Sequence, residues 1–421
     1  MLLTRRDFFR LSAACGAWSL SPFRTLLAAT APSPAPILVI YASGGWDPTM
    51  VFDPKIGNSA VAQESGWAEA SGAGGLPFIG HASRPAVNSF FAEYGANAVI
   101  INGLNTVAMD RWTAVTQVLA GLASGQTLRT DFLATYASLL APELDAPHLV
   151  IDAPYMPGSL SNVAVKLTTA QIRDYVTGLS NVDGLGDAGE AALATFRNAE
   201  YAHVASPANP ASLDGDKLAA LYGAETRETK LQVALARADQ ALGAPGTDAD
   251  FVRNAKIALE LFAAGTSLSA VVQAGADDLW ETRSGDHFTR QSANYQELFT
   301  GLSAILAHAD TLGLAEQLVV MVVSERGRHP RLNAQGGKEP WAFTSALLWG
   351  QGLNGTAVVG LTDDALRGIP IDPIFGTADS PSAVTIAMVN VYASLFLLGG
   401  LSIDTLLGGV KSLSRILATR G

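Results

Sequence analysis

Short apolar runs alternate along the chain with longer amphipathic stretches, and this pattern predicts strands separated by helices. Buried strands are expected at residues 37–41, 98–101, 148–151, 270–272, 318–323, 346–348 and 356–359. One helix is expected to end near residue 94. Four others are expected at residues 111–123, 131–140, 251–264 and 288–309. Continuous Val/Ile runs are typical of parallel strands that are covered on both faces. We therefore predict an α/β fold with a mainly parallel central sheet sandwiched by helices.

Three segments fall outside this alternation. Residues 57–80 are rich in Gly, Ala and Ser and are expected to form a long loop. A charged helical pattern between proline and glycine punctuation predicts a helical excursion at about 208–246. No charge falls between Asp379 and Asp404, so this stretch fits either a membrane span or a buried helix. Its Thr, Asn, Ser and Gly residues favour the buried helix.

The N-terminus has the pattern of an export signal. Residues 4–10 (TRRDFFR) match a twin-arginine motif, an apolar run follows, and small residues occupy 27–31. We predict a twin-arginine signal peptide at 1–31 and one folded domain at 32–421. The expected partner during export is the twin-arginine translocase, and the expected location is periplasmic or exported. An uncleaved leader that tethers the protein to the membrane is the alternative.

Composition narrows the class of protein. The 421 residues are 48% hydrophobic and 15% charged, which suits one large α/β domain or two smaller ones. The formal charge of −11 becomes −14 without the leader, because four arginines and one aspartate lie there. Such a charge repels nucleic acid backbones, so general nucleic-acid binding is excluded. The single cysteine, Cys15, lies in the leader, which excludes thiolate chemistry and disulfides in the exported domain.

Two acidic residues follow predicted strands, where parallel sheets collect functional groups. Asp47 comes after the first strand and Gly44-Gly45. It could bind a metal ion or cap the next helix. Glu325 comes after the most apolar strand, next to Arg326 and Arg328. It could be ion-paired, or it could belong to an anion pocket with these arginines.

Other motif chemistry is sparse. His287 is the histidine expected closest to a site, followed by His329, whereas the other four histidines fit surface or core positions. No two histidines have metal-ligand spacing. The chain also has no Gly-x-Ser-x-Gly elbow, Walker loop or dinucleotide glycine pattern in a suitable context.

Four stretches together resemble a known family. They are residues 44–47 (GGWD), 280–283 (WETR), 322–333 (VVSERGRHPRLN) and 336–341 (GGKEPW). In order and spacing, from about residue 36 to the C-terminus, the chain resembles the exported proteins of domain of unknown function 1501. These belong with the alkaline phosphatase and sulfatase fold, so the resemblance implies that fold here.

The resemblance also implies site residues. In that superfamily, metal ions bound by Asp and His at strand ends polarise a phosphate or sulfate ester. The candidate pocket acids carried over by motif position are Asp47, Glu281, Glu325 and Glu339. The family's two motif histidines are replaced by Arg283 and Pro340. A carboxylate-rich remnant suits Mg²⁺ or Ca²⁺ better than Zn²⁺.

The replaced histidines lead to our first hypothesis, an exported sulfatase-like protein with an eroded metal site. Arg283 would then place a fixed positive charge where a metal ligand belongs. Such a protein would bind an anionic ligand through Arg283, Arg326 and Arg328, or an envelope protein partner. The alternative is a metal-dependent hydrolase of phosphate or sulfate esters with a carboxylate-rich site. Its nucleophile is not identified, with Thr49 and Thr106 as candidates by position alone. A structural envelope-associated protein is the third hypothesis.

Overall fold

The computed structural model describes residues 34–121, 130–156, 158–160, 163–173, 230–243 and 248–418. The chain divides into two units, Met1–Pro34 and Ala35–Gly421, and the fold described here is that of the second. The predicted signal peptide at 1–31 lies outside the described residues. Most of the predicted excursion at 208–246 also lies outside them, and within it residues 230–242 form a helix.

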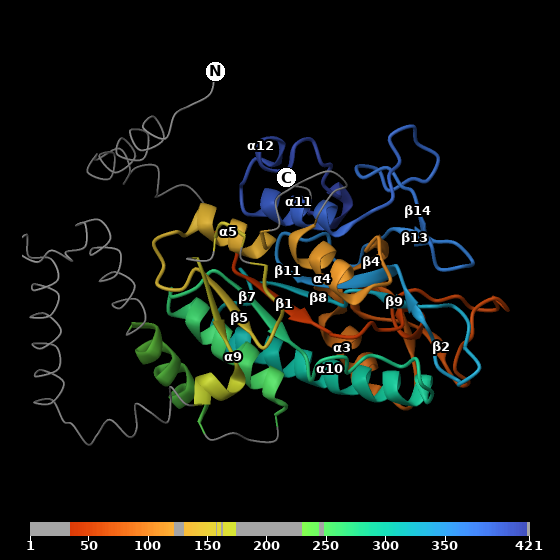
Figure 1. Cartoon of the computed structure of the whole chain (residues 1–421), viewed down its shortest axis with the longest axis horizontal. Helices are drawn as coiled ribbons and strands as arrows, with labels where there is room; N and C mark the ends of the chain where they lie inside the picture. The colour runs from red at the N-terminus through yellow and green to blue at the C-terminus, as the bar shows by residue number, and fades with distance from the viewer. Residues whose placement is uncertain are drawn as a thin grey trace, which may run out of the picture. The chain divides into compact units, whose positions relative to one another are not determined.

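An eight-stranded sheet forms the centre, with the order β12-β4-β11-β8-β1-β7-β5-β6 (Figure 1). In that order the strands are Val358–Val359, Ala98–Asn105, Phe343–Gly350, Val319–Val323, Ile37–Tyr41, Ser269–Gln273, His148–Ile151 and Ala164–Leu167. All neighbouring pairs are parallel except those of β11, which runs antiparallel to both β4 and β8. The predicted α/β fold with a mainly parallel sheet is therefore confirmed.

Helices cover both faces of the sheet, as Figure 1 shows. Along β1, Leu38 and Ile40 face one hydrophobic cluster while Ile37, Val39 and Tyr41 face the other, because side chains alternate along a strand. The first cluster packs against α3 (Pro85–Tyr94), α9 (Asp250–Ala263) and α10 (His287–Thr311). The second packs against α4 (Arg111–Ala120), α5 (Phe132–Leu140) and α11 (Met388–Leu398). The central strands are thus buried on both sides, which explains their unbroken apolar sequences.

Two segments differ from the sequence prediction. The expected loop at 57–80 contains an antiparallel hairpin, β2 (Ala68–Ser71) and β3 (Pro77–Gly80), because Phe78 and Ile79 have a core to enter. The edge strand β6 was not predicted, since its one fully buried residue gives no clear periodicity. Short strands complete the fold: β9 (Gly327–Arg328), β10 (Pro340–Trp341), β13 (Leu361–Thr362) and β14 (Gly368–Ile369).

The uncharged stretch between Asp379 and Asp404 contains α11, most of which is buried, and the short α12 (Ile403–Leu407) follows. This agrees with the buried-helix prediction. Among the described residues, no helix has both the length and the apolar character needed to cross a membrane.

Candidate functional site

The candidate site begins at a glycine turn directly after β1. Gly44 and Gly45 have φ angles of 116° and 95°, a region that side chains with a Cβ rarely adopt. A Cβ on Gly44 would lie 2.7 Å from the backbone nitrogen of Glu281. The glycines therefore let the turn pack tightly against the segment after β7. They lead the chain into Asp47, the N-cap of a short 3-10 helix, η2 (Pro48–Met50).

This packing supports one prediction. Gly44→Ala should lower the free energy of unfolding by about 1–3 kcal/mol, because the strained φ and the backbone clash act together. Chemical denaturation of the two proteins measures the difference. Gly57→Ala is the matched control, since it also has a positive φ but nothing within 4 Å of its Cβ position. Equal losses in the two variants would contradict the packing argument.

The Asp47 carboxylate is fully buried and has three side-chain partners. Lys338 Nζ donates to Oδ2 at 2.6 Å, and His287 Nε2 lies 2.8 Å from the same oxygen. Thr49 donates its hydroxyl to Oδ1 at 2.7 Å and its backbone N–H at 3.1 Å. Burial alone would raise the pKa of Asp47, but the charge of Lys338 and the hydrogen bond of His287 outweigh it and lower the pKa. Asp47 is thus an ionised helix cap that is held by a buried ammonium.

His287 occupies the first turn of α10. Since an ionised carboxylate can only accept, Nε2 carries the proton toward Asp47, and Nδ1 accepts from the Thr282 hydroxyl at 2.7 Å. Burial lowers the pKa of His287, so the ring is neutral at neutral pH. The histidine predicted to lie closest to a site is therefore a partner of Asp47, and both of its ring nitrogens are occupied.

Glu325 also contacts the glycine turn. Its carboxylate accepts the Gly44 N–H at 3.0 Å and the Ser324 hydroxyl at 3.3 Å. Burial raises the pKa of Glu325, and Arg326, with Nε 3.6 Å from Oε1, opposes that shift. Of the two alternatives for this residue, the observed contacts are those of an ion pair and a backbone anchor.

Glu281 binds the two buried arginines. It accepts from Arg328 Nη1 at 2.6 Å and from Arg326 Nη2 at 3.2 Å. Arg328 is fully buried, and its guanidinium makes five hydrogen bonds. The acceptors are the Glu281 carboxylate and the backbone oxygens of Gly44, Gly45, Trp280 and Lys338. A guanidinium has five N–H donors, so Arg328 has none left for a ligand.

Arg283 and Glu339 lie at the rim. The Arg283 side chain is 54% exposed, and it lies 3.3 Å from Glu281 and 3.4 Å from Glu339. Glu339 is 48% exposed and also accepts from Asn333. The positive charge inside the site therefore comes from Lys338, Arg326 and Arg328, and not from Arg283 as the sequence suggested.

The buried part of the site is balanced in charge. Three carboxylates, those of Asp47, Glu281 and Glu325, face three cations. Within the part of the chain that the structure describes, no group of three or more His, Cys, Asp or Glu side chains is placed to hold a metal ion. The arrangement can fix the turn after β1, but it offers no cluster of free carboxylates.

The chain matches one protein-family model. The model described as "Protein of unknown function (DUF1501)" matches residues 144–375, more than half of the chain. The chain belongs to the DUF1501 family. No functionally curated protein matches it significantly.

Several solved structures are similar to this DUF1501 chain at low sequence identity. A sulfatase from Pseudoalteromonas sp., PsFucS1, is 10% identical with a TM-score of 0.40, over 94% of this chain and 74% of that one. A protein in the alkaline phosphatase superfamily from Vibrio parahaemolyticus is 10% identical with a TM-score of 0.39, over 88% and 67%. A 2-O GAG sulfatase, BT1596, is 7% identical with a TM-score of 0.40, over 93% and 76%. Similarity at this level does not extend to activity, ligands or site residues.

Sequence reasoning missed the residue that organises the DUF1501 site. Lys338 lies inside the fourth motif, directly before Glu339 and Pro340, which occupy the family positions there. Lysine is rarely fully buried, so nothing in the local sequence indicates that Lys338 enters the core. The signal available was its place between Gly337 and Glu339 in a motif already singled out. The two nucleophile candidates, Thr49 and Thr106, are both buried and donate their hydroxyl protons to Asp47 and to the Ala342 carbonyl.

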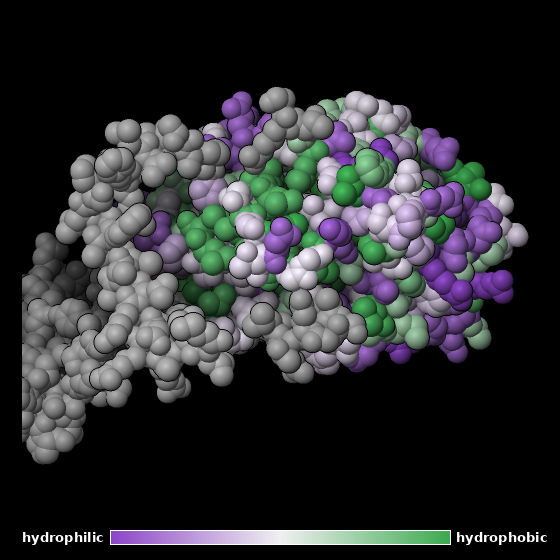
Figure 2. Space-filling view, turned by 90° about the horizontal axis from the view of Figure 1, so that it is seen from above, coloured by the Kyte–Doolittle hydropathy of each residue, from purple (hydrophilic) through white to green (hydrophobic). Residues whose placement is uncertain are grey.

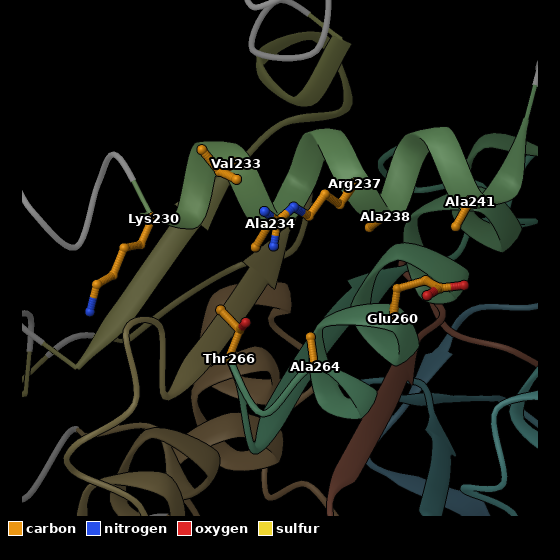
Figure 3. Close-up of a pocket in the computed structure, with 9 residues that line it drawn as sticks. All are labelled: Lys230, Val233, Ala234, Arg237, Ala238, Ala241, Glu260, Ala264 and Thr266. Atoms are coloured by element: carbon orange, nitrogen blue, oxygen red, sulfur yellow. The ribbon is translucent and has the colours of Figure 1, made fainter. Parts of the chain in front are cut away.

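Hollows lie elsewhere on the DUF1501 domain. One of about 610 Å³ runs between helical residues 230–242 and the C-terminal end of α9. Figure 3 shows that mainly Val233 and several alanines line it, with Lys230, Arg237 and Glu260 around them. A second hollow, of about 710 Å³, lies beside the first turns of α10. Neither is lined by the candidate pocket acids.

The surface also carries exposed hydrophobic side chains. Figure 2 shows hydrophobic residues gathered near the middle of the face seen from above, with more polar ones toward the right-hand end. Near the candidate site, the exposed fractions of Val107, Met109 and Trp112 are 62%, 56% and 63%. These residues follow β4 and begin α4, and the Met109 carbonyl accepts from Arg326. The Met109 carbonyl therefore links the buried cluster to an exposed apolar segment, residues 107–112.

Proposed function

We propose that this chain is an exported, sulfatase-like protein that does not use the metal chemistry of its superfamily and acts by binding a partner protein. The observation that carries the proposal is the fully buried ammonium of Lys338, 2.6 Å from Asp47. The acid expected to hold a divalent cation already has a permanent cation of the chain itself. The eroded site would then be a structural cluster under the binding surface.

The charge balance argues against an added cation. A divalent ion at Asp47 would have to displace Lys338 and leave its ammonium buried without a counter-charge, which is costly. Moving the ion toward Glu281 or Glu325 meets the same obstacle, because Arg326 and Arg328 hold those carboxylates. The carboxylate-rich hydrolase remains the alternative, and it needs these three cations to leave their present partners.

The contacts of the arginines and the exposed apolar residues near them favour a protein partner over a small anion. Arg328 has no free donor, and Arg326 donates to the Gly44 and Met109 carbonyls as well as to Glu281. Only Arg283, of the three candidate anion-binding residues, is substantially exposed. Val107, two residues before the Met109 carbonyl that Arg326 contacts, has a φ of 67°, which is strained for a β-branched residue. Strained, exposed apolar residues are typical of binding segments, and we propose an envelope protein as the occupant.

Metal analysis tests this proposal. Elemental analysis of the purified chain should find less than stoichiometric zinc, magnesium, calcium or manganese. Because an ion that binds only the folded state stabilises it, excess EDTA should leave the melting temperature unchanged. Aryl phosphates and aryl sulfates should not be turned over with Mg²⁺, Mn²⁺ or Ca²⁺. One tightly bound zinc ion per chain, lost in Glu325→Ala, would overturn the proposal and favour the hydrolase.

A further inference from the structure

A chain of hydrogen bonds passes through an exposed serine in the hollow beside α10. This hollow, of about 710 Å³, is lined by His81, Ser83, Phe288 and Ser292 among others. Ser83 is exposed, His81 is half-buried, and Ser292 is buried on α10. None of these residues takes part in the cluster around Asp47. The hollow is therefore a separate place at which to look for chemistry.

The hydrogen bonds connect two elements that are distant in sequence. Arg84 Nη1 donates to Ser292 Oγ at 2.8 Å. Ser292 Oγ lies 2.6 Å from Ser83 Oγ, and Ser83 Oγ lies 2.6 Å from His81 Nδ1. Arg84 is itself fully buried and paired with Glu64. A buried guanidinium thus stands at one end of the chain and an imidazole at the other.

The proton positions follow from the partners. The Ser83 backbone N–H donates to His81 Nδ1 at 3.0 Å, so this nitrogen is unprotonated. His81 Nε2 then carries the proton and donates to the Ser65 carbonyl at 2.9 Å. With Arg84 donating to Ser292, the consistent order is Ser292 to Ser83 and Ser83 to His81. Donors that all point one way polarise one another, which makes the Ser83 hydroxyl easier to deprotonate.

Local turn geometry explains only part of this arrangement. His329 makes the same turn, since its Nδ1 accepts the Arg331 backbone N–H at 3.1 Å. Among the residues that the structure describes, no hydroxyl contacts the His329 ring. At His81, by contrast, the serine hydroxyl is added, together with Ser292 from a helix more than 200 residues later. The added groups are those of a nucleophile and its base.

We propose that Ser83 is the nucleophile and His81 the general base of an acyl-transfer site that hydrolyses small, uncharged carboxylic esters. Ser83 Oγ attacks the ester carbonyl carbon, and its proton passes to His81 Nδ1. The carbon–oxygen bond to the alcohol breaks, and the leaving oxygen takes that proton. Water then attacks the acyl-serine by the same route and releases the carboxylic acid and free Ser83.

Surrounding groups fit this assignment. The Ser65 carbonyl orients the imidazole, and Glu64 Oε2, 3.9 Å from Nε2, stabilises the imidazolium that forms. Glu64 and the acidic charge of the chain disfavour anionic esters. Phe288 gives the acyl group an apolar wall. This proposed site is separate from the proposed partner binding, and the two proposals can be tested independently.

Covalent labelling of the full chain tests the proposal. A fluorophosphonate probe should give one adduct by intact mass, which peptide mapping places on Ser83. The chain should also hydrolyse 4-nitrophenyl acetate. Ser83→Ala should abolish both, and His81→Gln should slow labelling about a hundredfold or more, as expected for loss of a general base. Ser292→Ala should slow it less, because it removes only the polarising donor.

Two matched variants serve as controls. Thr289→Ala changes another side chain that lines the hollow, and His329→Gln removes the equivalent turn histidine. Both should label at the wild-type rate. No adduct, adducts spread over several serines, or an unchanged rate in a folded His81→Gln variant would each overturn the assignment.

Discussion

Lys338→Met should lower the free energy of unfolding at neutral pH by about 3–5 kcal/mol, the usual loss when one partner of a buried ion pair is removed. Methionine keeps most of the side-chain volume, so the loss reports charge and not a cavity. The Asp47 carboxylate would remain fully buried, with only His287 and Thr49 as side-chain partners. Urea denaturation at pH 7 measures the difference.

The double variant Asp47→Asn with Lys338→Met separates the ion pair from its surroundings. Asparagine keeps the oxygen that caps η2 and removes the charge, so the double variant should recover much of the stability lost in the single one. Without the ammonium, burial raises the pKa of Asp47, and the deficit of Lys338→Met should shrink as the pH falls. A deficit that is the same in the single and double variants would show that Lys338 acts only through packing.

The Asp47–Lys338 ion pair also shows what the sequence alone does not predict. The places of Asp47 and Glu325 followed from strand ends, because parallel strands bring their carboxyl ends to one edge. Their partners did not follow, since nothing in the local pattern distinguishes a buried lysine or arginine from a solvated one. Arg283 and Lys338 both lie in motif stretches, yet one side chain is 54% exposed and the other fully buried. Three-dimensional packing alone decides which of them neutralises the site.

The same contrast holds for the fold. β1, β5 and β8 were predictable because both faces of these strands are buried, which makes every position apolar. The β2–β3 hairpin was not, because β2 is mostly exposed and its sequence is composed of small and polar residues. His81 and Ser83 have no informative spacing either, since Ser292 is brought to them by α10 packing on α3.

A second buried acid lies far from the candidate site, at the start of α5. Asp131 caps this helix, with Oδ1 accepting the Leu133 N–H at 2.8 Å. Its other oxygen has no hydrogen-bond partner among the described residues and lies 3.9 Å from His148 Nε2. Burial raises the pKa of Asp131 to about 7 and lowers that of His148 to about 3. The core therefore favours the protonated form of Asp131 below about pH 7 and the neutral form of His148 above about pH 3.

Asp131→Asn should consequently stabilise the protein at alkaline pH and leave it unchanged at acid pH. In the unfolded chain the acid titrates near its ordinary value of 3.8, whereas in the folded chain it titrates at about 7. Its unfavourable effect on stability therefore begins above pH 4, grows as the pH rises, and is complete above pH 7. At 1.36 kcal/mol per unit, the difference reaches about 4 kcal/mol. Asparagine is an equally good helix cap, so the cap itself is preserved.

Denaturation of Asp131→Asn and the wild-type chain at pH 4, 6 and 8 checks this expectation, and His148→Gln provides the opposite case. The pKa of His148 is lowered in the folded protein, so the folded state resists protonation of the ring. This lowers the free energy of unfolding only as the pH falls below about 6.5, where the unfolded chain binds the proton. That variant should therefore gain stability toward acid pH, and Asp131→Asn toward alkaline pH. Parallel stability curves for all three proteins would mean that the two groups titrate normally. Opposite slopes would show that the core selects the uncharged form of each group.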